Sequence, residues 1–178
     1  SLDYKDLNNK RINIIHIPFN EKFISEYIYR SFEKALLLIK KDNKINLING
    51  PINKKKILKQ RFLGITEYLD FKTKSKGKTV MLIYNKNLSV SPLTTHLPLK
   101  NVHRYVNKKK IINHVQQISK FYRKKFNILP KIGITGLNPH CESNFYKSEE
   151  EKIIIPAIKY LSKKRFRVYG PYAADTIF

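Results

Sequence analysis

The sequence predicts an α/β protein in which helices flank a mixed sheet. Segments with the three- and four-residue apolar spacing of helices alternate with short β-prone runs, which is the pattern of layered α/β domains. The chain has 178 residues, 42% of them hydrophobic, and is long enough to bury a sizeable core. It has no internal repeat, and no apolar run approaches the length of a membrane-spanning helix. We therefore expect neither a disordered chain nor a transmembrane protein.

The first third of the chain predicts one helix between two β-prone segments. Residues 11–19 are rich in isoleucine and indicate a strand or an extended lead-in. Residues 21–41 carry apolar side chains at helical spacing, and Asn20 precedes them as a suitable N-cap. Residues 45–48 form a short apolar run that ends at Gly50, which is typical of a buried strand leading into a loop.

The middle of the chain predicts a hairpin and a second long helix. Two β-prone runs, residues 79–84 and 88–94, are separated by three polar residues, which favours an antiparallel hairpin. Residues 108–126 have an apolar stripe at helical spacing, and Pro130 follows just beyond them. We therefore expect an amphipathic helix there.

The last third predicts a buried strand followed by a helix. Residues 132–135 are a short apolar run that Gly136 interrupts. Ser148 and Glu151 have the spacing of a capping box at a helix start. Pro156 lies inside the helical pattern and predicts a kink or a late start.

The chain is strongly basic, with 36 Lys and Arg against 13 Asp and Glu, a net charge of +23. Such a charge raises the possibility of a basic nucleic-acid-binding module. However, the basic residues are mostly lysines spread among many isoleucines and asparagines, and no nucleic-acid-binding motif accompanies them. We interpret the charge mainly as compositional background and expect no specific nucleic-acid partner.

A single cysteine, Cys141, excludes an internal disulfide framework. The sequence also starts without a charged leader followed by an apolar core. Both observations favour a cytoplasmic protein.

Two histidines follow predicted strands and are candidates for a metal site. His96 and His140 each lie just beyond a predicted strand, at the edge where open α/β sheets bind ligands. The alternative is that both are ordinary polar loop residues, because a catalytic metal normally has three protein ligands and no third is evident. We expect His103 and His114 to be ordinary surface groups.

Five stretches together carry a family resemblance. They are Asn49-Gly50-Pro51-Ile52-Asn53-Lys54, Gly64-Ile65-Thr66-Glu67-Tyr68-Leu69, Thr94-Thr95-His96-Leu97-Pro98-Leu99, Gly136-Leu137-Asn138-Pro139-His140, and Glu149-Glu150 with Ile155-Pro156-Ala157 and the later Gly170-Pro171 and Ala174-Asp175-Thr176-Ile177-Phe178. In their order and spacing the chain resembles the 4-hydroxythreonine-4-phosphate dehydrogenase family of vitamin B6 biosynthesis. The resemblance covers nearly all of this chain but only the middle part of a family member.

The resemblance implies an NAD-dependent enzyme that uses a divalent metal ion, zinc, cobalt or magnesium. Its reaction would be the oxidation and decarboxylation of 4-phosphooxy-L-threonine to 3-amino-2-oxopropyl phosphate. By the same resemblance His96 and His140 are metal ligands and Thr66 contacts the substrate. Asn53 and Lys54 are candidates for a phosphate-binding or loop-bracing role, although a solvated lysine is the simpler interpretation. The catalytic and NAD-binding residues stay unassigned.

The family fold is the two-domain α/β architecture of isocitrate and isopropylmalate dehydrogenases, here incomplete. In that arrangement residues 1–62 belong to the first domain, and residues 63–178 form the metal, substrate and dimerisation domain. The resemblance also implies a homodimer that acts on a small phosphorylated amino acid.

The chain departs from the family at two places. Ile65 stands where the family usually has a substrate-binding histidine, and residues 141–144 replace a glycine-rich stretch. The family segment that supplies a third metal histidine is absent. These departures favour the alternative of a truncated or degenerate relative without catalysis.

Overall fold

The computed structural model describes residues 10–42, 44–53, 57–58, 62, 64–75, 77–141 and 148–177. The chain divides into two compact units, Ser1–Tyr68 and Leu69–Phe178. The division falls within helix α3 (Ile65–Thr73), a few residues beyond the expected boundary at residue 62. That expected domain boundary stays a prediction.

Helix α1 (Ile24–Lys41) dominates the first unit, as the sequence predicts. A 3₁₀ turn, Glu21–Phe23, precedes it, and the Asn20 side chain accepts a hydrogen bond from the Lys22 amide at 2.9 Å. Phe32 is the buried residue of α1, and its ring packs edge-on against Tyr68 at 5.5 Å between centroids. Tyr68 is 1% exposed and also contacts the ring of Tyr29. This aromatic cluster links α1 to the start of α3.

Of the two β-prone runs in the first unit, residues 11–19 take the extended alternative, and the strand expected at residues 45–48 is wrong. Residues 11–19 are extended but form no strand, and Ile12 is 90% exposed. Residues 45–48 are also irregular, and Ile48 is 92% exposed. A β-prone run becomes a strand only when another segment supplies its hydrogen-bond partners, and no described segment of this chain pairs with either run. Local β-propensity therefore predicted strands that these residues do not form.

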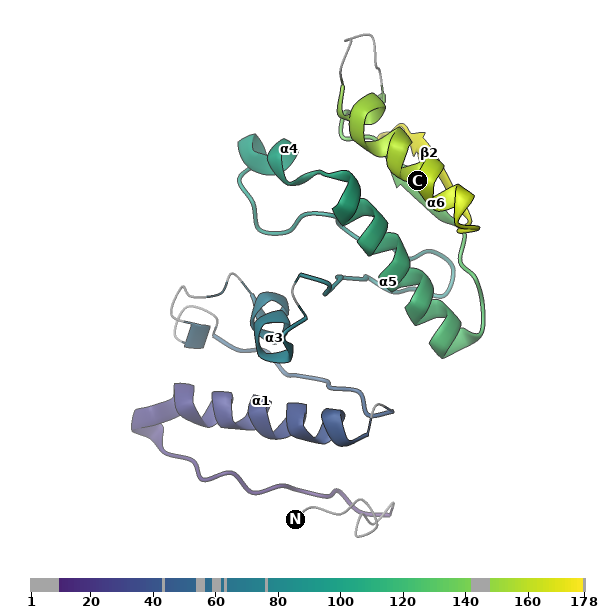
Figure 1. Ribbon diagram of the computed structural model, residues 1–178. Coiled ribbons are helices and arrows are strands. Elements are labelled where there is room, and N and C mark those ends of the chain that lie inside the picture. The colour runs from purple at the N-terminus through teal and green to yellow at the C-terminus, as the bar shows by residue number, and fades with distance from the viewer. Residues whose placement is uncertain are drawn as a thin grey trace. The chain divides into compact units, whose positions relative to one another are not determined.

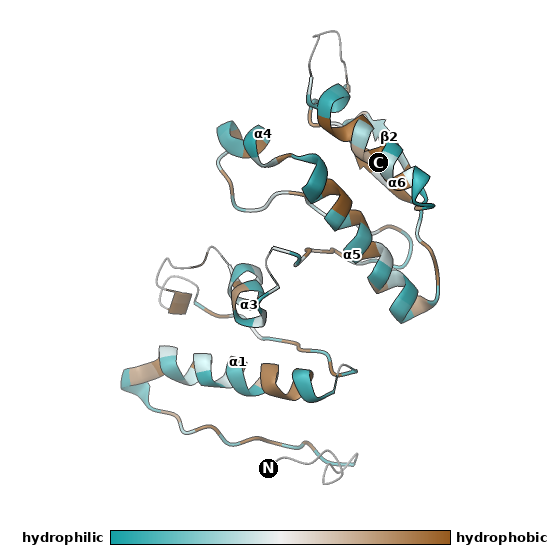
Figure 2. Ribbon diagram, viewed as in Figure 1, coloured by the Kyte–Doolittle hydropathy of each residue, from teal (hydrophilic) through white to brown (hydrophobic). Residues whose placement is uncertain are grey.

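The second unit contains the longest helix, α5 (Lys108–Phe126), at the predicted bounds. The Asn107 side chain caps it by accepting a hydrogen bond from the Lys110 amide at 2.9 Å. Asn127 ends it in the left-handed conformation, in which asparagine replaces the usual glycine. A 3₁₀ turn, Leu99–Asn101, and the short helix α4 (Val102–Tyr105) come before it. Figure 2 shows hydrophobic and hydrophilic residues alternating along α5, as expected for an amphipathic helix.

The predicted hairpin is confirmed, in a minimal form. Ile83 and Val90 form an antiparallel bridge, with N···O distances of 2.8 and 2.9 Å between their backbones. The turn between them is closed by the Asn85 side chain, which accepts a hydrogen bond from the Asn87 amide. Ile83 is 60% exposed, so the hairpin has little buried surface to extend its pairing.

The sheet of the second unit consists of two parallel strands, β1 (Ile132–Thr135) and β2 (Val168–Tyr172). Ile132 pairs with Val168, and an irregularity lies between Gly133 and Thr135. A parallel pair requires a crossover, and helix α6 (Ile155–Lys163) provides it. The α/β class is thus confirmed. The expected mixed sheet is wrong for the described part of the chain, where the sheet is parallel and the antiparallel Ile83–Val90 bridge lies outside it. The sequence does not predict strand β2, because the dipeptide Gly170-Pro171 is typical of a turn.

Helix α6 starts late, as Pro156 predicts. A π-helical turn, Glu150–Ile154, comes first, and Pro156 lies in the first turn of α6, where its missing N–H costs no helical hydrogen bond. Ser148 Oγ accepts a hydrogen bond from the Glu151 amide at 3.3 Å, which confirms the cap.

The core of the second unit lies where α5, α6 and β2 meet, and Figure 1 shows α5 beside α6. Its buried members are Val106, Ile111, Val115, Ile154, Ala157, Ile158, Leu161 and Val168. None of the described helices combines the length and the apolar composition needed to cross a bilayer.

Candidate functional site

The loop that follows β1, residues 136–141, presents His140. Cys141 N donates to Asn138 O at 3.1 Å, which closes a turn with Pro139 at its second position, where proline is favoured. The His140 side chain is 68% exposed. Its Nδ1 lies 3.0 Å from Asp175 Oδ2. We call this segment the His140 loop.

The contact with Asp175 determines which nitrogen of His140 is available. A carboxylate can only accept at neutral pH, so the 3.0 Å contact favours the tautomer with the ring proton on Nδ1. The lone pair of the neutral ring is then on Nε2. A carboxylate that holds one ring nitrogen while the other binds a metal is the usual outer-shell arrangement of metal histidines. His140 therefore has the chemistry of a metal ligand.

The segment that carries Asp175 also braces the backbone of the His140 loop. Tyr172 O accepts from Gly136 N at 2.9 Å and from Cys141 Sγ at 2.8 Å. Ala174 N donates to Pro139 O at 2.7 Å. The half-buried Cys141 thus acts as a hydrogen-bond donor to the backbone of β2.

Gly136 is required where the loop begins. A Cβ added there would collide with Cys141 Sγ and would lie 3.1 Å from both Asn138 O and Glu150 Oε1. The loop therefore folds back on its own first residue, and only glycine fits.

Glu150 contacts the same loop from the helical side and was not assigned a role from sequence. It is 1% exposed, and its Oε1 accepts from the amides of Leu137 at 2.8 Å and Asn138 at 3.0 Å. Burial alone would raise the pKa of this carboxyl, but the hydrogen bonds from Asn138 and Leu137 outweigh it and the pKa lies below its ordinary value. In the sequence, Glu149-Glu150 is part of the family resemblance, but nothing in the local pattern indicates a contact with the loop after β1.

His96 is exposed and lies in a partly buried loop, residues 94–98, which we call the His96 loop. Leu93, just before it, packs against the core of the second unit. After the loop, Asn101 N donates to Pro98 O at 2.8 Å and begins a 3₁₀ turn. His96 therefore lies between a core residue and a short helical turn.

The backbone is unusual at both candidate loops. Among the described residues, five other than glycine have a positive φ, and three of them, Lys74, Asn127 and Arg165, follow helix ends. The other two are His96 and Cys141, both with φ of 54°. Such conformations are uncommon outside helix caps and cluster at functional sites. This observation singles out the two loops without reference to any relative.

The described residues do not complete a metal site. Within the part of the chain that the structure describes, no three His, Cys, Asp or Glu side chains lie together as a possible set of ligands. His140 has its carboxylate partner and His96 is exposed to solvent, so the two imidazoles fit as donors. A third ligand is not among the described residues.

The substrate-side candidates lie in the first unit. Thr66 is half-buried in the first turn of α3, next to the half-buried Ile65. Asn53 is exposed, and its carbonyl accepts from the Ile57 amide at 3.0 Å. Lys54 lies outside the described residues.

His114 is not the surface group that we expected from sequence. It is half-buried on α5, and its Nε2 lies 2.7 Å from Ser91 Oγ. Burial and, secondly, the charge of Lys110 lower its pKa. The Ser91 hydroxyl donates to Met81 O, so the imidazole is the donor to Ser91. With its proton engaged elsewhere, Ser91 is not an activated nucleophile, and the pair instead ties the hairpin to α5.

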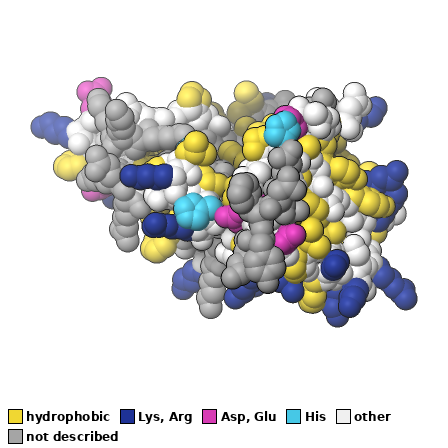
Figure 3. All heavy atoms as spheres, turned by 90° about the horizontal axis from the view of Figure 1, so that it is seen from above, with side chains coloured by type: hydrophobic (Ala, Val, Ile, Leu, Met, Phe, Trp, Pro, Cys, Tyr) yellow, Lys and Arg dark blue, Asp and Glu magenta, His cyan; other side chains and the backbone are white. Residues whose placement is uncertain are grey.

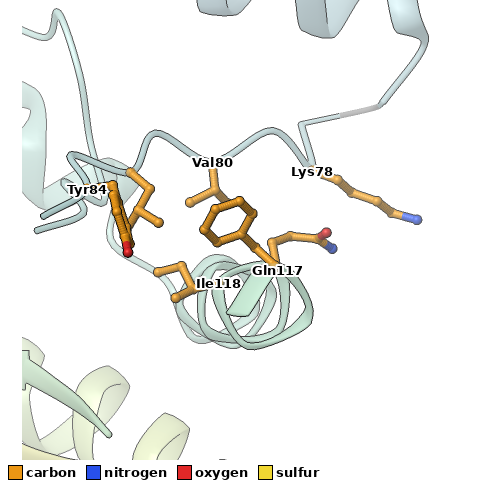
Figure 4. Close-up of a pocket in the computed structure, with 7 residues that line it drawn as sticks. Lys78, Val80, Tyr84, Gln117 and Ile118 are labelled. Carbon is orange, nitrogen blue, oxygen red and sulfur yellow. The ribbon is translucent and has the colours of Figure 1, made fainter. Parts of the chain in front are cut away.

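A groove of about 340 Å³ lies between this hairpin and α5. Figure 4 shows Val80 and Tyr84 facing Ile118 across it, with Lys78 pointing away. Its lining is mostly apolar and consists of Lys78, Val80, Leu82, Tyr84, Gln117, Ile118 and Phe121. In Figure 3 the Lys and Arg side chains occupy many separate points of one face, in keeping with the scattered distribution in the sequence.

Known proteins resemble this chain along most of its length. A protein from Sulfurihydrogenibium sp. (strain YO3AOP1) called 4-hydroxythreonine-4-phosphate dehydrogenase is 40% identical over 136 residues, covering 74% of this chain and 42% of the relative. A protein of the same name from Aquifex aeolicus is 34% identical over 176 residues, covering 94% of this chain and 53% of the relative. The chain thus spans about half the length of these relatives.

Solved structures give the same result. The 4-hydroxythreonine-4-phosphate dehydrogenase of Klebsiella pneumoniae superposes with a TM-score of 0.74 at 28% identity, over 86% of this chain and 48% of that one. The enzyme of that name from Burkholderia phymatum gives 0.62 at 27% identity, over 86% and 46%. The family profile described as pyridoxal phosphate biosynthetic protein PdxA matches residues 5–178. The chain belongs to the PdxA family.

Proposed function

We propose that this chain serves an NAD-dependent, divalent-metal-assisted oxidation and decarboxylation of 4-phosphooxy-L-threonine to 3-amino-2-oxopropyl phosphate. The observation that carries the proposal is the pairing of His140 with Asp175 in a braced loop, within a chain whose relatives are named 4-hydroxythreonine-4-phosphate dehydrogenase. Family membership supports the reaction, and the loop geometry supports the metal ligand.

A bound zinc, cobalt or magnesium ion would polarise the substrate hydroxyl and the ketone formed from it, while NAD would accept the hydride. The candidate residues would support that chemistry in different ways. His140 offers the lone pair of Nε2, and Asp175 retains the proton on Nδ1 and orients the ring. The exposed His96 supplies a second imidazole.

We assign the substrate side to Thr66, whose hydroxyl would hydrogen-bond the substrate. Asn53 and Lys54 belong to the motif that would face the phosphate or brace its loop. The net charge of +23 would attract an anionic substrate of this kind.

The assembly follows from the same family. We propose the two-domain architecture of isocitrate and isopropylmalate dehydrogenases, with residues 1–62 in the first domain and 63–178 in the second. We also propose a homodimer, and a cytoplasmic location that suits a chain with one cysteine and no possible internal disulfide.

A non-catalytic relative is the second candidate, and two observations favour it. Ile65 cannot replace a substrate-binding histidine, because its side chain neither donates nor accepts a hydrogen bond. In addition, the described residues contain no third metal ligand. In this alternative the chain folds and binds metal weakly but has no turnover.

Titration with cobalt(II) tests the metal site in the 178-residue chain. We expect His96→Ala and His140→Ala each to weaken binding at least about tenfold, because each removes a donor nitrogen. His103→Ala is the matched control, since His103 is an exposed histidine on α4, and it should leave the affinity unchanged. Unchanged affinity in both His96→Ala and His140→Ala would contradict the metal assignment.

Turnover separates the enzyme from the non-catalytic relative. NADH formation from 4-phosphooxy-L-threonine supports the enzyme, and we expect Ile65→His to increase it by restoring a hydrogen-bonding group. Metal binding without NADH formation, in the chain and in Ile65→His alike, supports the non-catalytic relative.

A further inference from the structure

We propose that Glu150 is a positioning residue, which holds the backbone of the His140 loop so that Nε2 of His140 faces the metal. This inference rests on the proposed function, in which His140 is a metal ligand. The pair Glu149-Glu150 contributes to the family resemblance, but the sequence assigns Glu150 no role of its own.

The contacts of Glu150 are made to the two residues that lead into the turn. Its Oε1 accepts from the amides of Leu137 at 2.8 Å and Asn138 at 3.0 Å. Its Oε2 accepts from the side-chain amide of Asn138 at 3.2 Å. These bonds fix Asn138, the first residue of the turn whose third residue is His140. A change at Glu150 therefore propagates to His140 through the backbone.

Glu150 is itself anchored in the core. It begins the π-helical turn that continues into α6, and the following residues Ile154, Ala157 and Leu161 are all buried. A rigid element thus carries the carboxylate, as precise positioning of a loop requires.

The imidazole is consequently fixed from two directions. Glu150 holds the backbone on the helical side of the loop, and Asp175 holds the Nδ1 edge of the ring at 3.0 Å. Asp175 selects the tautomer of His140, whereas Glu150 determines the position of the imidazole ring through the loop backbone. The two carboxylates therefore have separate tasks.

Burying an ionised carboxylate is energetically unfavourable. Removing a charge from water costs several kcal/mol unless hydrogen bonds replace the lost hydration. Here three N–H donors of the His140 loop surround the carboxylate, so its charge is compensated by that loop. The compensation is lost if the loop moves away, which couples the charge of Glu150 to the position of His140.

Substitutions at Glu150 and at its neighbour test the inference by cobalt(II) titration of the 178-residue chain. Glu150→Ala should weaken binding about 10- to 100-fold, the usual effect of losing an outer-shell partner. Glu150→Gln keeps the shape and one acceptor oxygen, so its loss should be smaller. Glu151→Gln is the matched control, because Glu151 is exposed one residue further on, and it should bind like the unsubstituted chain.

Amide hydrogen exchange without metal provides the second measurement. Glu150→Gln should speed exchange at Leu137 and Asn138 while leaving the amides of α5 protected. If Glu150→Ala fails to fold, Glu150→Gln decides the question, since it introduces no cavity.

The outcomes separate the two proposals. Cobalt(II) affinity that is unchanged in both Glu150 variants, while His140→Ala abolishes it, overturns the positioning role and leaves the metal site standing. Affinity that is unchanged in His140→Ala overturns the metal site itself, whatever Glu150 does.

Discussion

The His140 loop and the His96 loop both carry a candidate metal histidine, but different chemistry holds them. A buried, ionised carboxylate, Glu150, binds the amides of the His140 loop. The segment that leads to the His96 loop is instead tied to α5 by a neutral imidazole, through the 2.7 Å contact of His114 with Ser91. The two loops are therefore expected to respond differently to pH.

The sign of each response follows from the direction of the pKa shift. The pKa of Glu150 is lowered by its hydrogen bonds despite burial, and that of His114 is lowered by burial and by Lys110. A lowered pKa in the folded state means that the unfolded chain binds the proton more readily, so stability is lost as pH falls. The loss begins near the ordinary pKa of each group, about 6.5 for histidine and about 4.3 for glutamate. Mild acid should therefore loosen the hairpin before it affects the His140 loop.

The largest effect is expected from the core that both loops share. Leu93 and Leu137 pack against the cluster that contains Leu161, which is 0% exposed. Leu161→Ala should lower the free energy of unfolding by about 3 kcal/mol in urea denaturation, because it leaves a cavity beneath both loops. Leu37→Ala, at a side chain that is 58% exposed, should cost less than about 0.5 kcal/mol. Equal losses in the two variants would show that the core does not support the loops.

Gly136→Ala should affect the His140 loop alone. The new Cβ would collide with Cys141 Sγ, and we expect a loss of about 2 kcal/mol in the free energy of unfolding, typical of overpacking. Hydrogen exchange at Ile83 and Val90 should stay as slow as before, since they belong to the hairpin. Gly50→Ala is the control, because nothing lies within 4 Å of a Cβ there. A destabilised hairpin would show that the two loops are not independent.

Glu150→Gln should cost about 1.5 kcal/mol of unfolding free energy at pH 7, where hydrogen bonds to the charged carboxylate are lost. The contribution of Glu150 is fully present above about pH 4.3 and disappears as pH falls through its lower folded-state pKa. Denaturation at a series of pH values should therefore show the variant approaching the unsubstituted chain in acid. A constant difference down to low pH would mean that the charge is not what stabilises the loop.

The smallest effect is expected at the hairpin. Ser91→Ala should cost about 1 kcal/mol at pH 8, the net value of a buried hydrogen bond. His114→Gln should remove the decline in stability that the chain shows as pH falls below about 6.5. His16→Gln changes an exposed histidine and should leave the decline in place. If the decline persists in His114→Gln, another group is responsible for it.

Helices were the part of the fold that local sequence could predict. The apolar spacing and the caps Asn20 and Asn107 define α1 and α5, and all of this information lies within one or two turns of chain. Strands were harder, because their partners lie elsewhere. The isoleucine-rich residues 11–19 form no strand, whereas β2 pairs with β1 despite containing Pro171.

The sequence by itself determined the family, the main helices and the two candidate histidines, because motifs and periodicity are local properties of the chain. Only the tertiary structure showed which side chains contact His140 and its loop. Asp175 contacts His140, and Glu150 contacts Leu137 and Asn138 in the same loop. The parallel pairing of β1 with β2 and the crossover through α6 bring these separate segments together. Burial likewise decided that His114 is a structural tie, since a pattern of spacing cannot show that Ser91 from a distant hairpin covers it. Contacts between segments that are distant in the sequence depend on how the chain folds back on itself, and local sequence patterns do not predict this.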